Sequence, residues 1–149
     1  MSSGEQPGQD QVTLRDEWGN LAVTISVKGI VFEDGKIWLR MNERCDWELP
    51  GGKLDDDEQP EETIVREIRE ELGREISSPK LVDVYVWKKD FGKATHVEIV
   101  TFVTEVHTVV GDFEHVGEAG RSQFKLFTFE DALALENLPD VYKRALRKV

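Results

Sequence analysis

The sequence is poor in cysteine and in positive charge, and it has no long apolar run. Its one cysteine, Cys45, excludes an intrachain disulfide framework, and we expect an ordinary loop thiol because no nucleophile motif surrounds it. The 19 Lys and Arg residues face 30 Asp and Glu residues, which gives a net charge of −11. Such a charge argues against a general nucleic-acid binder or a protein of anionic membrane surfaces, because phosphate groups would be repelled.

Two further absences bear on location. No apolar stretch approaches the length that crosses a membrane, and the first residues lack the basic and then apolar pattern of a secretory signal. A lone cysteine also fits a reducing compartment. We therefore expect a cytoplasmic protein with no membrane partner.

The composition that remains is that of an ordinary globular protein, and 149 residues are enough for one domain with its own core. Residues 1–11 are polar and predict a disordered tail, which leaves 12–149 for the domain. Runs rich in Val and Ile predict strands, and apolar residues at helical spacing predict helices. The strands are expected at 21–32, 36–41, 80–89, 95–110 and 123–129, and the helices at 60–73, 129–135 and 139–148. This order indicates a mixed α/β domain.

The helix expected from Pro60 carries a cluster of acids. Pro60 suits the first helical turn, and Gly73 is where the helix can end in a left-handed residue. Glu67, Glu70 and Glu71 are related as i, i+3 and i+4, so they share one stripe of the helix. Carboxylates that close repel one another, and a divalent cation would remove the repulsion; hard oxygen ligands select magnesium or manganese. The alternative is a solvated helix whose acids pair with arginines, and the helix alone leaves both interpretations open.

A glycine turn precedes this helix. The segment from Trp47 to Gly52, Trp-Glu-Leu-Pro-Gly-Gly, has the pattern of a strand end that turns sharply and offers a backbone carbonyl to a metal. Together with the helix it resembles the box of the Nudix hydrolase family, G-x5-E-x7-R-E-U-x-E-E-x-G-U, in which U is aliphatic. The matching residues are Gly52, Glu58, Arg66, Glu67, Ile68, Glu70, Glu71 and Gly73. The last aliphatic position departs from the pattern, because Arg74 occupies it.

The resemblance implies a fold, an activity and a cofactor. Nudix domains are α/β/α sandwiches around a mixed β-sheet, and they cleave a phosphoanhydride bond in a nucleoside diphosphate linked to another group. By this resemblance, Mg²⁺ or Mn²⁺ binds Glu70 and Glu71, with Glu67 as a third ligand or as a base that orients water. The carbonyl of Gly51 would complete the coordination.

Other residues of the box are expected to have a structural role. Glu58 and Arg66 are interpreted as a pair that ties the loop to the helix, in preference to a direct catalytic role. Gly52 and Gly73 belong to the turns of the motif.

The family often adds one carboxylate from a late loop, as a further metal ligand or as the base. The residues of that kind here are Glu118, Glu114 and, on the preceding strand, Glu98. Glu118 is favoured, because it lies in the loop shortly before the strand that is expected from residue 123. For each of the three, a solvated surface acid is the alternative interpretation.

The sequence indicates less about the group that is attached to the diphosphate of the substrate. A stacked base needs an aromatic side chain near the site, and Trp47, Trp87 and Phe91 stand at strand ends or turns that can face it. Each is more often a core residue. A small nucleotide diphosphate substrate is the expected partner, and since many members of the family are dimers, a homodimer is compatible with the resemblance.

Two function classes are weighed against each other. The leading hypothesis is a metal-dependent hydrolase of phosphoanhydride bonds. The alternative is a non-catalytic module on the same fold that binds or senses a nucleotide, and a third is an acidic scaffold protein whose helix only looks like the box. Sensors of this kind commonly lose the helix carboxylates, whereas this chain retains Glu67, Glu70 and Glu71.

Overall fold

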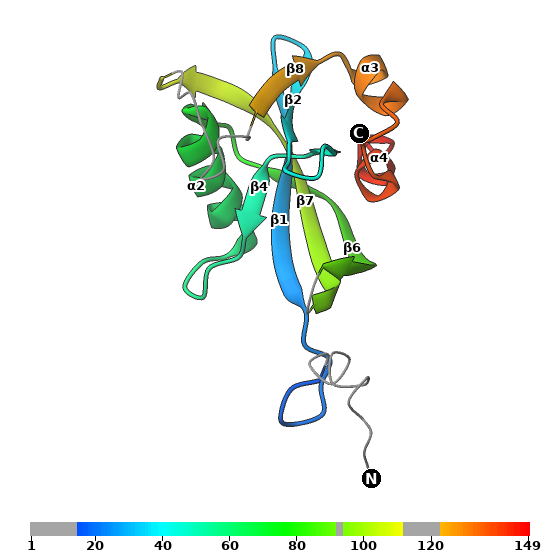
Figure 1. The fold of residues 1–149 in the computed structure, drawn as a ribbon. Helices are drawn as coiled ribbons and strands as arrows, with labels where there is room; N and C mark the ends of the chain where they lie inside the picture. Colours follow the sequence, from blue (N-terminus) through cyan, green and yellow to red (C-terminus); the bar gives the residue numbers. More distant parts are fainter. Residues whose placement is uncertain (1–14, 92–93, 112–122) are drawn as a thin grey trace.

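The computed structural model describes residues 15–91, 94–111 and 123–149. Within them lies an eight-stranded mixed sheet with helices on both sides (Figure 1). The strands are β1 (Thr24–Glu33), β2 (Lys36–Met41), β3 (Trp47–Glu48), β4 (Gly51–Lys53), β5 (Arg74–Ile76), β6 (Lys80–Phe91), β7 (Ala94–Val109) and β8 (Gln123–Phe127). The helices are α2 (Pro60–Leu72), α3 (Phe129–Ala134) and α4 (Asp140–Leu146).

Strands β1 and β7 form the centre of the sheet and run parallel, from Thr24 opposite Val97 to Phe32 opposite Glu105. The other strand pairs are antiparallel: β2 and β4 pair with β1, β5 and β6 with β7, and β3 and β8 with β2. A strand that is covered on both faces needs apolar residues on both faces. In β1 this explains why Val27, Ile30 and Val31 are all fully buried.

The two faces of the sheet carry separate cores. Ile64, Ile68 and Leu72 of α2 pack on one face, with Val27 and Val31 of β1. The residues of α4 pack on the opposite face in a second cluster, made of Ile30, Ile37, Leu39, Leu49, Ile99, Ala132, Leu138, Val141, Tyr142, Ala145 and Leu146. The expected α/β/α sandwich is therefore confirmed, with α2 as one outer layer and α3 and α4 as the other (Figure 1).

The helix α2 follows the sequence closely. It begins at Pro60, and the carboxylate of Glu62 accepts a hydrogen bond from the Gln59 N–H at 2.8 Å, which compensates for the weak capping residue type at Gln59. It ends before Gly73, whose φ of 66° is left-handed and whose N–H bonds the carbonyl of Arg69. The last helix, α4, is tied to β6 by Asp83, which accepts from Arg144 Nε at 2.9 Å and Lys148 Nζ at 2.8 Å.

Some boundaries differ from those that the sequence predicts. The first strand starts at Thr24 rather than at residue 21, and β8 ends at Phe127 because Thr128 caps α3 by accepting from the Asp131 N–H. The strand β5, directly after the helix, was not predicted. In the parts of the chain that the structure describes, no helix has the length and apolarity needed to span a membrane.

Arg74, the residue that departs from the box, is a buried anchor in β5. Its Nε donates to Glu33 Oε1 at 2.9 Å, and its NH1 donates to the carbonyls of Leu72 at 2.9 Å and Gly111 at 3.0 Å. Its guanidinium also lies over the ring of Trp38. Arg74 thus joins the end of α2 to the β1–β2 hairpin and to the end of β7, which replaces the apolar contact that the box usually makes there.

We predict that R74M lowers the free energy of unfolding by about 2–4 kcal/mol, because Glu33 and two carbonyls lose a buried charged donor. Chemical denaturation measures this. The matched control is R69M, since Arg69 is exposed and pairs only at the surface with Glu75; we expect a loss of about 1 kcal/mol or less. Equal losses of unfolding free energy in the two variants would show that Arg74 stabilises the fold no more than an exposed arginine does.

Candidate functional site

The site begins with two glycines that lie between the central strand and the acidic helix. Gly51 has φ 147°, and a Cβ added there would lie 2.0 Å from the carbonyl oxygen of Val27. A Cβ added to Gly52 would lie 2.4 Å from Oε2 of Glu67. Any side chain at these positions would therefore displace backbone or the Glu67 carboxylate. The turn needs glycine because β4 must approach β1 on one side and Glu67 on the other.

Arg66 connects the loop before α2 to the carboxylates of the helix. Its Nε and NH2 donate to the two oxygens of Glu58 at 2.7 and 3.0 Å, and Thr63 Oγ1 donates to Glu58 Oε1 at 2.9 Å. Its NH1 donates to Glu67 at 3.0 Å and to Glu70 at 3.2 Å. The hydrogen bonds from Arg66 hold the pKa of the Glu58 carboxyl below its ordinary value. Glu58 and Arg66 thus lie in contact as a pair between loop and helix.

Glu71 is the most unusual group of the box. Burial, and next the nearby Glu67, raise the pKa of its carboxyl from 4.5 to about 7, although Lys28, Arg40 and the Gly51 N–H favour the ionised form. Its Oε1 is buried and has no hydrogen-bond partner among the described residues. A buried acceptor without a partner is rare and costly. A hard cation is one group that would satisfy this oxygen, so the donor set fits a divalent metal.

The three helix carboxylates are less tightly gathered than the sequence suggested. Glu67 lies against Gly52 and next to Glu71, whereas Glu70 has 59% of its side chain exposed and contacts Arg66. The stripe spans enough of the helix surface for one member to face solvent. Among the described residues, the acids whose oxygens do gather within 4.8 Å of one another are Asp55, Asp56 and Asp57, all three exposed in the loop before α2.

The candidates for an additional carboxylate are placed only in part. Glu118 and Glu114 lie outside the described residues. Glu98 lies on β7, opposite Ile25 of β1, and because side chains alternate along a strand it points to the other face of the sheet from Val97 and Ile99. Those two residues line a cavity on the α4 side of the sheet, so Glu98 does not face that cavity.

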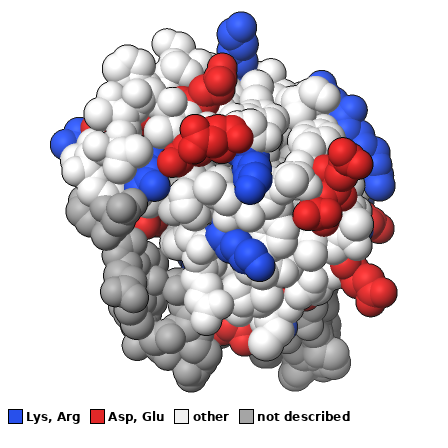
Figure 2. Space-filling view, turned by 90° about the horizontal axis from the view of Figure 1, so that it is seen from above, with Lys and Arg blue, Asp and Glu red and all other residues white. Residues whose placement is uncertain are grey.

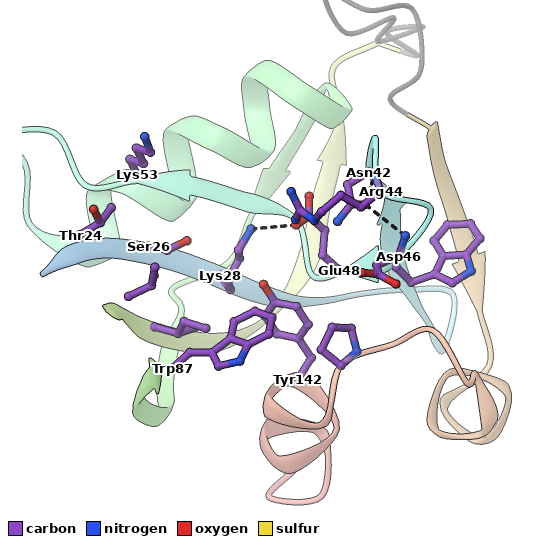
Figure 3. A pocket seen from close by; sticks show the side chains of 14 residues that line it. Thr24, Ser26, Lys28, Asn42, Arg44, Asp46, Glu48, Lys53, Trp87 and Tyr142 are labelled. Carbon is purple, nitrogen blue, oxygen red and sulfur yellow. Dashed lines mark hydrogen bonds and ion pairs between the residues drawn. The ribbon is translucent and has the colours of Figure 1, made fainter. Parts of the chain in front are cut away.

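A cavity of about 250 Å³ lies on the α4 side of the sheet (Figure 3). Trp47 and Trp87, two of the candidate stacking residues, line it, and they also pack on the core: Trp47 against Phe127 at 4.8 Å and Trp87 against Tyr142 at 5.9 Å between ring centroids. Phe91 ends β6, and its side chain lies outside the part that the structure describes. The complete lining is Thr24, Ser26, Lys28, Asn42, Arg44, Asp46, Trp47, Glu48, Lys53, Trp87, Val97, Ile99, Pro139 and Tyr142.

The charged residues that line this cavity were not predicted from the sequence; they are Lys28, Arg44, Asp46, Glu48 and Lys53. Lys28 and Glu48 line it, and Glu48 accepts a short hydrogen bond from Arg40 while its other oxygen lies 3.8 Å from Lys28 Nζ. The signal for Lys28 was available, because a lysine interrupts an otherwise apolar strand. The positive charges of Lys28 and Arg40 both lower the pKa of Glu71, so a residue that lines the cavity affects a carboxylate of the box. On the face that Figure 2 shows, acidic and basic side chains are interspersed rather than separated.

Comparison with known proteins identifies the domain. A sequence profile described as the NUDIX domain matches residues 23–149. A "MutT-like protein" of Streptomyces ambofaciens is 42% identical over 64 residues, which are 42% of each chain, and the ADP-ribose pyrophosphatase of Bacillus subtilis is 31% identical over 117 residues, 75% of this chain and 62% of that protein. A crystal structure of a MutT NUDIX hydrolase from Burkholderia pseudomallei superposes with a TM-score of 0.68 at 28% identity, covering 86% of this chain and 98% of the other. The chain thus spans less than two thirds of the length of the two relatives matched by sequence.

The raised pKa of Glu71 predicts a pH-dependent cost in the metal-free protein. Because its folded pKa of about 7 lies above the ordinary 4.5, ionising Glu71 destabilises the fold, with the full cost above pH 7 and none below pH 4.5. We expect E71Q, in chelator, to be more stable than the wild type by about 3 kcal/mol at pH 8, with the gain vanishing toward pH 4.5. Denaturant titration across this pH range measures it.

The control is E70Q. Because Glu70 is exposed, this substitution should change the free energy of unfolding only slightly at every pH. A stability gain for E71Q that does not change with pH would contradict the assignment of the cost to ionisation.

Proposed function

The chain belongs to the NUDIX family, and from that premise we propose that it is a divalent-metal-dependent hydrolase. Its substrate class is a nucleoside diphosphate linked to another group, and the bond it cleaves is a phosphoanhydride. The observation that carries this proposal is a buried oxygen of Glu71 that has no hydrogen-bond partner among the residues described, beside Glu67 and a glycine turn that leaves no room for a side chain.

We assign Glu67, Glu70, Glu71 and the carbonyl of Gly51 to a Mg²⁺ or Mn²⁺ site, with Glu118 as a further ligand from outside the described residues. When bound, the cation neutralises phosphate oxygens and makes a coordinated water more acidic. Support comes from the chemistry of the donor set, which is all oxygen, and from the cost of leaving Glu71 ionised without a partner.

The remaining box residues position these groups. Arg66 donates to Glu67 and Glu70 from a guanidinium that is itself fixed by both oxygens of Glu58. Glu67, held against Gly52, has a fixed orientation from which it accepts the proton of an attacking water or serves as a ligand. Firm placement matters because a displacement of about 1 Å can cost roughly 100-fold in rate.

The cavity on the α4 side of the sheet is suited to the group attached to the diphosphate. At about 250 Å³ it is smaller than the roughly 300–1,000 Å³ of sites for drug-sized ligands, so it fits one ring system and not a whole dinucleotide. Trp87 and Tyr142 supply apolar wall, and polar side chains supply hydrogen bonds. The likeness to an ADP-ribose pyrophosphatase supports a substrate of this general kind.

The test is release of phosphate or nucleoside monophosphate from a panel of nucleoside diphosphate derivatives, in Mg²⁺, in Mn²⁺ and in chelator. We predict activity that requires metal. E71Q and E70Q should each lower turnover by about 100-fold or more, because charge stabilisation of the phosphates is weakened. E61Q is the matched control, since Glu61 lies on the same helix, is exposed and occupies a variable position of the box.

Full activity of E70Q and E71Q on the best substrate would overturn the assignment of ligands. A panel that binds, as a rise in melting temperature, but is not hydrolysed would favour the non-catalytic sensor instead.

A further inference from the structure

Lys28 is a charged residue in the most buried strand of the sheet. It has 8% relative exposure, between the fully buried Val27 and the core residue Ile30. Because side chains alternate along β1, Lys28 shares a face with Ser26 and Thr24, and all three line the cavity (Figure 3). A lysine is almost never buried without a partner.

The hydrogen-bonding capacity of this ammonium is not used within the described residues. Its ion-pair partner there is Glu48, at 3.8 Å from Nζ to Oε1, which is longer than a hydrogen bond. Glu48 is already engaged more closely, by Arg40 through Oε2. The Lys28 ammonium, with three donors, therefore reaches the cavity while Arg40 neutralises the nearest acid.

Lys28 remains a cation in this setting. Burial acts to lower the pKa of its ammonium, while Tyr142, Glu48 and Glu71 act to raise it, and the net pKa lies above the ordinary value. The site is thus a fixed positive charge with open donors inside a cavity. Such a group attracts an acceptor that carries negative charge.

The position of Lys28 indicates which part of a substrate it meets. It is paired with Gly51 across β1 and β4, so its backbone adjoins the turn that leads into the box. Its side chain lines the cavity, with the ammonium directed toward Glu48, which precedes the same turn (Figure 3). The ammonium therefore lies between the turn of the box and the rest of the cavity, where a substrate with its diphosphate at the box and its attached group in the cavity would place the phosphate nearest that group.

We propose that Lys28 binds the phosphate adjoining the group held in the cavity. The inference rests on the proposed function, because it concerns the same substrate. It gives this chain a substrate contact outside the box, on the opposite face of β1 from the acidic helix. Lys28 then selects for ligands that keep a phosphate on the cavity-bound group.

The experiment measures binding rather than turnover. Isothermal titration calorimetry of the full chain in Mg²⁺ uses AMP, GMP, CMP and UMP, and the four corresponding nucleosides, as probes. We expect K28M and K28Q to weaken binding of the best monophosphate by about tenfold or more, because a charge-assisted hydrogen bond is lost. Binding of its nucleoside should change less than twofold. K36M is the matched control, since Lys36 is an exposed lysine outside the cavity.

A second comparison separates phosphate binding from a purely structural role. If Lys28 only neutralises Glu48, the double variant K28M/E48Q regains monophosphate binding; under our proposal it does not. Equal weakening of monophosphate and nucleoside, recovery in the double variant, or no monophosphate binding by the wild type would each overturn the proposal. Hydrolysis is scored separately, so a chain that binds monophosphate through Lys28 but does not hydrolyse the panel would refute the enzyme and keep this contact.

Discussion

The close approach of the glycine turn to its two neighbours is the constraint on which the rest of the structure depends. Gly51 has the carbonyl of Val27 where a side chain would be, and Gly52 has the carboxylate of Glu67 there. This contact brings the acidic face of α2 to the edge of the central strand. Glu71 lies next to this contact, because the Gly51 N–H donates to its carboxylate. Burial, and next the charge of Glu67, raise the pKa of Glu71 to about 7, and one of its oxygens has no hydrogen-bond partner in the described part of the chain.

Two arginines hold this arrangement, one from the middle of the helix and one from just beyond its end. Arg66, in the middle of α2, ties the helix to the preceding loop through Glu58, and Arg74, two residues after α2, ties the helix end to Glu33 and to the carbonyl of Gly111. Both are charged donors with several acceptors, which fix orientation better than an apolar contact does. A helix fixed at two places can keep carboxylates that repel one another in position.

The parts that the sequence predicts well are those with local causes. The bounds of α2 follow from Pro60, Gly73 and an apolar stripe, and each of these acts within a few residues. The exposure of Glu70 could not be inferred, because the i, i+3, i+4 spacing defines a stripe but not which part of it meets the turn. The strand β5 was missed because three residues led by an arginine carry no apolar alternation. The cavity could not be predicted for another reason. Lys28 and Tyr142, which both line it, are far apart in the chain, and they come together only when the strands pair and α4 packs on the sheet.

The chain as a whole is negatively charged, whereas the charged residues that line its cavity are mostly positive. A net charge of −11 repels phosphates at long range. Around the cavity, however, Lys28, Arg44 and Lys53 outnumber Asp46 and Glu48. At distances beyond about 8–10 Å, physiological salt screens the distant acids, so a bound ligand experiences mainly the nearby cations. An acidic surface then disfavours long polyanions such as nucleic acids, which must contact a wide area, while a single small phosphate compound that enters the cavity meets a locally positive environment. The same chain therefore combines a negative overall charge with a cavity whose charged lining residues are mostly cations.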